Sequence, residues 1–167
     1  NIIFGKSFFT EKLGTIDFKS DTIHRNFKAN KYITSVTNDI TWSPISYITK
    51  SGFVNSLKGI IKNTNYEAKN TTDHKVDGVV NELSSVLSFK SSLPMKKDGI
   101  NFSNIFSPNF MIRYAPGHMR DLRNDDQTFK YSDLFSTNRT SVIENGLNAV
   151  LGFEFSMYNK ITKNENK

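Results

Sequence analysis

A chain of 167 residues with 37% hydrophobic residues, a formal charge of +6 and a mean hydropathy of −0.47 is compatible with one soluble domain or with part of a larger protein. No stretch approaches the about 18 consecutive apolar residues that a membrane-spanning helix needs, so that class is excluded. Cysteine is absent, which removes disulfide scaffolds, thiol nucleophiles and cysteine metal sites. The lysines and arginines are spread thinly instead of forming one stripe with aromatic residues, so no nucleic-acid partner is expected.

In chain order, the first four predicted strands cover residues 2–9, 13–27, 32–48 and 51–66. Their apolar residues tend to recur at every second position, as at Ile16 and Phe18, although the pattern is noisy here. Apolar residues at this spacing would spiral around a helix instead of forming a stripe. These segments therefore predict an extended chain.

Three further predicted strands, at 78–93, 101–115 and 146–160, alternate more strictly. In the last one, the odd positions from Leu147 to Met157 are apolar, while most even positions are small or polar. Each strand thus presents one apolar and one polar face. We expect the polar faces to line the inside of a barrel, with these residues pointing inward: Glu82, Lys90, Asn101, Ser103, Asn109, Arg113, Asn148 and Glu154.

Strand length and connection length favour a membrane barrel over a soluble sandwich. Several predicted strands reach about 15 residues, whereas soluble strands centre on about 5–6. The first, third and fifth connections are short, and the fourth and sixth, at about 67–77 and 116–145, are longer, as in outer-membrane barrels. We therefore expect an all-β fold over residues 1–167: an antiparallel up-and-down sheet of about seven strands that forms part of a transmembrane β-barrel wall.

Enzyme activity is not expected. His24, His74 and His118 are expected in turns or loops, apart from one another and from acidic residues at ligand spacing. No Gly-x-Ser-x-Gly elbow lies near them. The sequence therefore predicts no catalytic residues, no metal and no cofactor.

The two ends of the chain suggest an internal segment. The chain starts at Asn1 without an initiator Met, a basic leader or a cleavage site, and it stops in the polar residues 164–167. We expect a piece of barrel wall cut from a longer protein.

An ordered set of motifs runs from Ser103 to Tyr158, over about a third of the chain. A strand with two prolines and a tyrosine precedes a polar loop, a Leu-Phe pair, an Asn-Arg pair, an acidic-glycine turn and a closing strand. The residues that carry this order are Pro108, Tyr114, Pro116, Leu134, Phe135, Asn138, Arg139, Glu144, Gly146, Gly152 and Glu154. The order resembles the barrel of the LptD family, formerly called Imp or OstA. Thr140-Ser141-Val142 departs from the Phe-Ser-Gly continuation that this family often has.

The resemblance implies a place in the outer membrane of a bacterium and a part in lipopolysaccharide transport. It implies that lipopolysaccharide is delivered to the outer leaflet, and that the partners are an LptE-type lipoprotein plug, periplasmic lipopolysaccharide-bridge components and membrane lipid. No bond chemistry is involved. Two alternatives stay open: another outer-membrane barrel, such as a porin or a TonB-dependent receptor, and a soluble all-β binding domain.

Several matched residues have a physical interpretation of their own. Pro108 cannot donate a ladder hydrogen bond, so we expect it at a bulge or local break that bends the wall. Leu134 and Phe135 should hold a polar loop against the barrel mouth. Arg139 and Glu144 either pair at the base of this loop or are both solvated. Gly146 suits a tight turn into the final strand.

Overall fold

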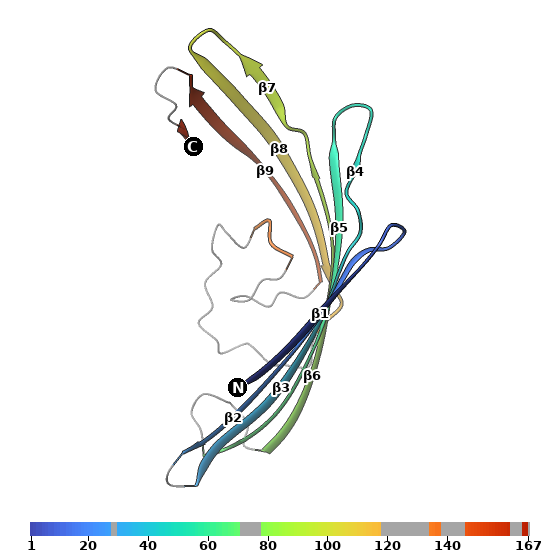
Figure 1. Cartoon of the computed structure of the whole chain (residues 1–167), viewed down its shortest axis with the longest axis vertical. Coiled ribbons are helices and arrows are strands. Elements are labelled where there is room, and N and C mark those ends of the chain that lie inside the picture. Colours follow the sequence, from blue (N-terminus) through green and yellow to red (C-terminus); the bar gives the residue numbers. More distant parts are fainter. Residues whose placement is uncertain (28–29, 71–77, 118–133, 138–145, 161–164, 167) are drawn as a thin grey trace.

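The computed structural model describes residues 1–27, 30–70, 78–117, 134–137, 146–160 and 165–166. These residues form one sheet of ten strands (Figure 1). The strands are β1 (Ile2–Thr10), β2 (Gly14–Phe27), β3 (Lys31–Ser43), β4 (Tyr47–Ile48), β5 (Val54–Lys69), β6 (Gly78–Ser92), β7 (Met95–Asp98), β8 (Phe102–Ala115), β9 (Gly146–Asn159) and β10 (Glu165–Asn166).

Apart from the short strands β4 and β7, strands that are neighbours in the sheet follow one another along the chain. The order is β1-β2-β3-β5-β6-β8-β9-β10, with β4 on β5 and β7 on β8, and every pair is antiparallel. The prediction of an all-β, antiparallel up-and-down sheet is confirmed. The sheet is open, with β1 and β10 as its two edges. Among the described residues, no helix is long and apolar enough to cross a membrane.

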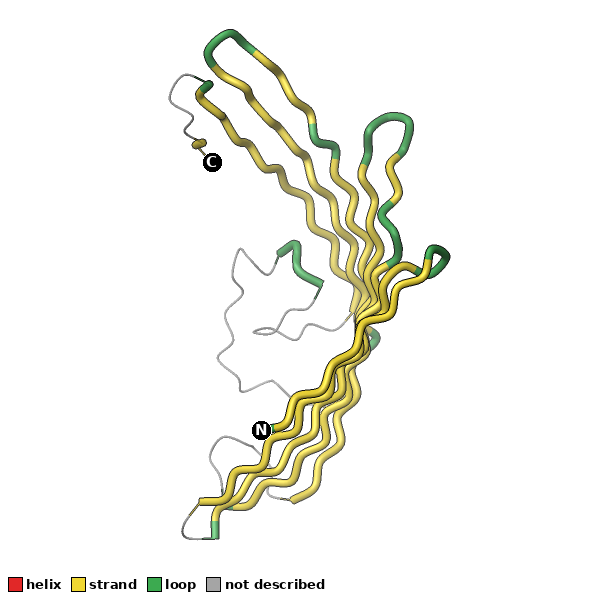
Figure 2. Tube along the Cα trace, in the orientation of Figure 1, coloured by secondary structure: helices red, strands yellow, loops and turns green. Residues whose placement is uncertain are grey.

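Successive connections alternate between the two ends of the sheet (Figure 2). The turns after β1, β4 and β7 share one end and are short; in the second of them, Thr49 N donates to Phe53 O over 2.9 Å. The connections after β2, β5 and β8 leave from the other end, and the last two of these are the longest in the chain. Short and long connections are thus separated by side, except for the short β2–β3 connection.

The predicted strand 32–48 is wrong as a single strand. β3 ends at Ser43 and only Tyr47–Ile48 continues as β4, because Pro44 has no N–H to donate to a ladder. The glycine at the start of β2 fits closely against this break. Gly14 has φ 76°, and a Cβ there would lie 2.4 Å from the carbonyl oxygen of Ser43, so only glycine allows this approach.

A second break separates β6 from β7, which the sequence had placed within a turn. β6 ends at Ser92, just before Pro94, and β7 resumes at Met95 along the same partner strand. Pro108 lies opposite the gap and accepts a hydrogen bond from Leu93 N over 3.1 Å. The expected local break is therefore found opposite Pro108: it interrupts the neighbouring strand, between β6 and β7, and not β8 itself.

Of the two alternatives expected at Pro108, a bulge or a local break, the bulge is not found. β8 pairs with β9 residue by residue through this point, with Ser107 opposite Glu154, Pro108 opposite Phe153 and Asn109 opposite Gly152. A bulge would place two residues opposite one. Because Pro108 has no N–H to donate, the ladder is interrupted there, but only on the side of β8 that faces β6 and β7.

The sheet is curved, and residues 134–137 lie on its concave side (Figures 1 and 2). Few side chains are buried: the buried hydrophobic residues among those described are Ile33, Ile60, Ala68, Met111 and Ala115. The convex side has no second layer within the described part of the chain. Leu147 and Leu151, on the convex side of β9, are 72% and 80% exposed.

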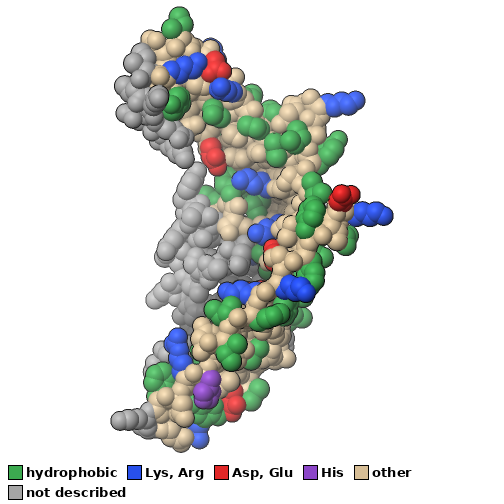
Figure 3. All heavy atoms as spheres, in the orientation of Figure 1, with side chains coloured by type: hydrophobic (Ala, Val, Ile, Leu, Met, Phe, Trp, Pro, Cys, Tyr) green, Lys and Arg blue, Asp and Glu red, His purple; other side chains and the backbone are tan. Residues whose placement is uncertain are grey.

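Hydrophobic side chains follow much of the convex margin, from which a few charged side chains project, and both basic and acidic side chains occur within the hollow on the other side (Figure 3). Because cross-strand partners share a face, the register assigns Phe18, Ile40 and Ile61 to one convex row. Two members of that row are polar: Ser85, opposite Ile61, and Lys6, opposite Phe18, whose Nζ lies 4.8 Å from the Phe8 ring centroid. The convex face is otherwise a broad apolar band.

An amide ladder borders this band on the side of the long connections. Ser20 Oγ donates to Asn38 Oδ1 over 2.8 Å, and Asn63 Nδ2 donates to Asn81 Oδ1 over 3.0 Å. Asn65 Nδ2 extends the ladder to Asn63 Oδ1. Side chains on the convex face therefore change from apolar to polar along β2, β3, β5 and β6.

Candidate functional site: the concave face

The register places the polar side of each central strand on the concave face. Arg113 pairs with Ser88 on β6 and with Asn148 on β9. Met111 lies two residues before Arg113 on β8 and is paired with Lys90 on β6. Met111 is only 1% exposed. The centre of this face thus combines hydroxyl, amide and cationic groups around one buried apolar side chain.

Residues 134–137 are held against this face by side chains of β6 and β8. The hydroxyl oxygens of Ser88 and Thr137 lie 2.6 Å apart. Arg113 Nε donates to the carbonyl oxygen of Thr137 over 3.2 Å. Lys90 Nζ lies 5.5 Å from the ring centroid of Phe135, a cation–π distance. A segment between β8 and β9 in sequence is therefore fixed on the sheet by three different contacts.

Arg113 is the most informative of these side chains because it is charged and only 3% exposed. A guanidinium that is removed from water needs hydrogen-bond acceptors to offset the cost. The Thr137 carbonyl oxygen supplies one of them. Burial of Arg113 and attachment of the segment therefore depend on each other.

Gly152 on β9 provides room for the aromatic ring of this segment. A Cβ at Gly152 would lie 3.0 Å from two ring atoms of Phe135. This is closer than real Cβ atoms normally approach, so the ring lies directly on the backbone of β9. Phe135 therefore packs on the concave face at Gly152, whereas the prediction placed it against the barrel mouth.

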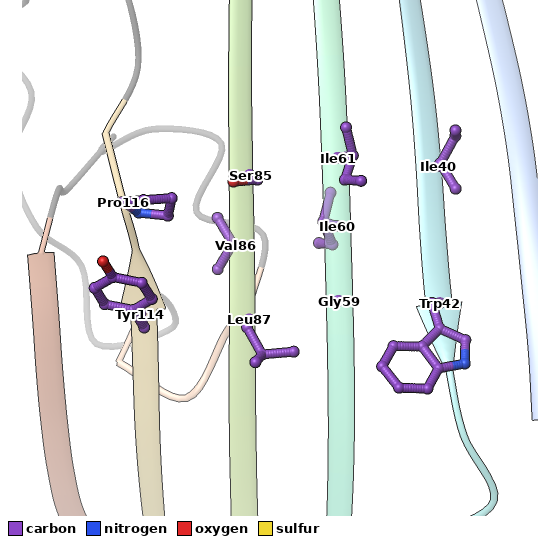
Figure 4. A pocket seen from close by; sticks show the side chains of 10 residues that line it. All are labelled: Ile40, Trp42, Gly59, Ile60, Ile61, Ser85, Val86, Leu87, Tyr114 and Pro116. Carbon is purple, nitrogen blue, oxygen red and sulfur yellow. The ribbon is translucent and has the colours of Figure 1, made fainter.

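A shallow groove with a volume of about 370 Å³ lies on the opposite, convex face (Figure 4). Gly59 forms a gap between the side chains of Trp42 and Leu87, and Ile40, Ile61 and Tyr114 also line the groove. Trp42 Nε1 donates to the carbonyl oxygen of Leu13 over 2.8 Å, so its polar atom is satisfied within the protein. The groove presents mainly apolar surface, which suits contact with hydrocarbon.

Most residues predicted on the polar face belong to the concave face. The register and the contacts with residues 134–137 place Lys90, Asn109, Arg113 and Asn148 there, and the alternation along their strands adds Glu82, Ser103 and Glu154. Asn101 differs: it lies in the turn between β7 and β8, where its carbonyl oxygen accepts a hydrogen bond from Lys160 N over 2.8 Å. It is not part of a strand face because β8 begins one residue later.

The family-motif residues fall into three groups. Gly152 and Glu154 belong to the concave face, whereas Pro108 and Tyr114 belong to the convex face. Gly146 starts β9 with φ 90°, Pro116 follows β8, and Leu134 and Phe135 belong to the attached segment. Asn138, Arg139 and Glu144 lie outside the described residues, as does most of the loop 116–145.

Sequence reasoning missed two residues of this face, Lys58 and Thr137. Lys58 pairs with Ser88, and the alternation along β5 could have placed it, since Lys62 lies four residues away on the same side. Nothing in the sequence indicated Thr137, which reaches the sheet only through the fold of a loop. The expected loop position of His24 is wrong: it lies in β2, with Nδ1 2.8 Å from Thr34 Oγ1.

His74 and His118 lie outside the described residues. Within the part of the chain that the structure describes, no three His, Cys, Asp or Glu side chains gather where they could hold a metal ion. The concave face carries charges of both signs, since Glu82 and Glu154 share it with Lys90 and Arg113.

An antiparallel meander with one apolar face, one polar face and no covering layer over its described residues has the architecture of a membrane β-barrel wall. Residues 7–166 match the family described as LptD: LPS transport system D, and the chain belongs to this family. The family consists of outer-membrane β-barrel proteins of Gram-negative bacteria that act in lipopolysaccharide transport and assembly. Neither the curated proteins nor the solved structures contain a match to this chain.

Proposed function

We propose that this sheet is a section of barrel wall whose concave face borders the path of lipopolysaccharide to the outer leaflet. The observation that carries the proposal is the one-sided distribution of apolar residues: the convex band is uncovered in the described structure, and the concave face is polar. A wall in a bilayer needs lipid-compatible side chains outside and can carry hydrophilic ones inside. In this proposal the wall acts through its apolar and polar surfaces and carries out no chemical reaction.

The orientation of the wall follows from its connections. Outer-membrane barrels have short periplasmic turns and longer external loops. The turns after β1, β4 and β7 are therefore assigned to the periplasm, and the connections after β5 and β8 to the cell exterior. The amide ladder of Ser20, Asn38, Asn63 and Asn81 then lies at the outer boundary of the hydrocarbon layer.

The proposed partners follow the same arrangement. The saccharide part of lipopolysaccharide and an LptE-type lipoprotein plug would meet the polar concave face. Periplasmic lipopolysaccharide-bridge components would approach from the side of the short turns. Membrane lipid would cover the convex band, including the groove at Gly59.

Depletion of the protein in growing cells tests the transport role. Newly made lipopolysaccharide should stop reaching the cell surface and accumulate on the periplasmic side. Surface lipopolysaccharide that is unchanged while uptake of a small solute is lost would contradict the proposal and support a porin or receptor.

Site-specific crosslinking tests the facing of the wall. A photo-crosslinking residue at Ser84, on the concave side of β6, should form lipopolysaccharide adducts only while transport is running. The adjacent Leu83 serves as the control because it points to the convex side, where contact with resting lipid does not depend on transport. Transport-independent adducts at Ser84 would refute the assignment of this face to the transport path.

A further inference from the structure

The concave face contains a polar cavity of about 370 Å³ between the sheet and the attached segment. Two lysines, Lys58 and Lys90, line it together with the hydroxyl groups of Ser56, Ser88 and Thr137. No carboxylate is among the described residues that line it. This volume lies within the range of about 300–1,000 Å³ that is typical of small-molecule sites.

The two lysines are diagonal neighbours on adjacent strands. Lys58 on β5 is directly opposite Ser88, and Lys90 on β6 is directly opposite Ser56. Diagonal residues of an antiparallel pair lie roughly 7–8 Å apart, within reach of long side chains. The sheet thus brings two positive charges together and gives each a serine, not an acid, as its cross-strand partner.

Another lysine of the same face shows the contrast. Lys62, four residues after Lys58 on β5, lies 3.7 Å from the carboxylate of Asp39 on β3. Its charge is balanced within the protein. Lys90 instead has the Phe135 ring beside its ammonium group, which leaves its charge uncompensated by any described carboxylate of the cavity.

We infer that this cavity binds a phosphorylated sugar, with Lys58 and Lys90 on the phosphate and the hydroxyl groups of the wall on the sugar. Two ammonium groups supply several charge-assisted hydrogen bonds to phosphate oxygens. The hydroxyl oxygens of Ser88 and Thr137 lie 2.6 Å apart, and Ser56 Oγ donates to the Lys90 carbonyl oxygen over 3.5 Å. Because each hydroxyl oxygen also has acceptor lone pairs, these groups can still accept hydrogen bonds from the hydroxyl groups of a saccharide. A bare phosphate would occupy only a small part of the cavity.

The inference rests on the proposed function for the source of this ligand, a phosphorylated saccharide of the transported lipid. Binding itself is measurable without transport. The two ideas can therefore fail separately: loss of surface lipopolysaccharide tests transport in cells, and affinity for a soluble sugar phosphate tests the cavity.

The test uses the protein as it occurs in cells, purified in detergent, and three probes: glucose 1-phosphate, glucose and inorganic phosphate. Calorimetric titration should show that glucose 1-phosphate binds more tightly than either of the other two. The double variant Lys58→Gln and Lys90→Gln should weaken its binding roughly tenfold or more, since two charge-assisted contacts are lost. The double variant Lys58→Arg and Lys90→Arg, which keeps both charges, should retain most of the affinity.

Lys62→Gln is the matched control, because it removes a lysine from the same strand and face that is already paired with Asp39. It should leave the affinity within about twofold. An unchanged affinity in the glutamine double variant, or an equal loss in Lys62→Gln, would overturn the site. Equal affinity for inorganic phosphate and glucose 1-phosphate would overturn the assignment to a phosphorylated sugar.

Discussion

Gly152 and Phe135 form a contact between a strand and a loop segment that depends on the absence of one side chain. A Cβ at Gly152 would lie 3.0 Å from the Phe135 ring, so the Gly152→Ala variant should push the ring away from β9. Overpacking of this kind costs about 1–3 kcal/mol. We expect a lower midpoint in denaturant unfolding of the detergent-solubilised protein.

A double-mutant cycle separates this contact from a general effect on the strand. In a Phe135→Ala background, the Gly152→Ala substitution should have almost no effect, because the ring that it meets is gone. Equal destabilisation in both backgrounds would show that the cost arises in β9 itself and not from the attached segment.

Asp98, the last residue of β7, lies beside the short turn to β8 among charged neighbours. Hydrogen bonding to Lys96 above all, with the facing Ser103 and Lys160 adding to the effect, lowers the pKa of Asp98 to about 2 from its ordinary 3.8. Lys96 Nζ and Lys160 Nζ lie 3.0 and 3.2 Å from its carboxylate. The ionised form is thus favoured in the folded protein.

The pH dependence follows from this direction. The contribution of Asp98 to stability is fully present above about pH 3.8 and is lost as the pH falls through about 2. A carboxyl NMR titration should give a midpoint near 2, and Lys96→Gln should move it toward 3.8. Lys97→Gln, at the adjacent position in β7, should leave it unchanged. High salt should raise the midpoint as well, since all three side chains are partly exposed.

At the scale of elements, the strict alternation in the second half of the chain was sufficient to predict β8 and β9 within a residue or two. Alternation reports directly which face is apolar, so it also predicted the faces of Arg113 and Asn148. Alternation does not report breaks in a ladder. The expected strand 32–48 ignored Pro44, and β7 was hidden in a charged, lysine-rich stretch that resembles a turn.

The attached segment marks the limit of what the sequence could predict. Phe135 was expected to pack a loop against the barrel mouth, but its contacts with Lys90 and Gly152 depend on the register of three strands. Thr137 contributes a backbone carbonyl to Arg113, and a backbone group leaves no trace in residue type. Alternation within one strand determines which face a side chain occupies, whereas the register between strands distant in sequence determines which side chains meet at a site.

The faces of β9 can be tested with two adjacent residues. Phe153 lies on the convex side and is 64% exposed, while Glu154 lies on the concave side. Phe153→Lys should lower the stability of the protein in lipid vesicles by about 2–4 kcal/mol if it lies near the middle of the bilayer. Glu154→Lys, which places the same charge one residue away, should cost far less. Similar losses in the two variants, measured by urea unfolding, would contradict the facing of this strand.

At the scale of the whole molecule, one property explains most of the structure: the sheet has no other layer among its described residues to cover its convex face. Soluble proteins rarely expose contiguous apolar patches larger than a few hundred Å². Here exposed Phe, Leu and Ile side chains follow the convex face from β1 to β9. The open edges at β1 and β10 add unpaired backbone groups that favour association with other strands.

These features predict how the 167-residue chain behaves by itself. Refolded in buffer without detergent, it should aggregate, because its convex face exposes apolar side chains to water and its two edge strands have unpaired backbone hydrogen-bonding groups. Refolded above the critical micelle concentration of a mild detergent, it should stay dispersed and give the circular dichroism spectrum of a β-sheet. Analytical ultracentrifugation across a detergent series measures the difference. A monodisperse monomer in plain buffer would mean that the apolar face is covered within the chain, which would favour the soluble all-β binding domain and remove the basis for placing lipid on the convex side.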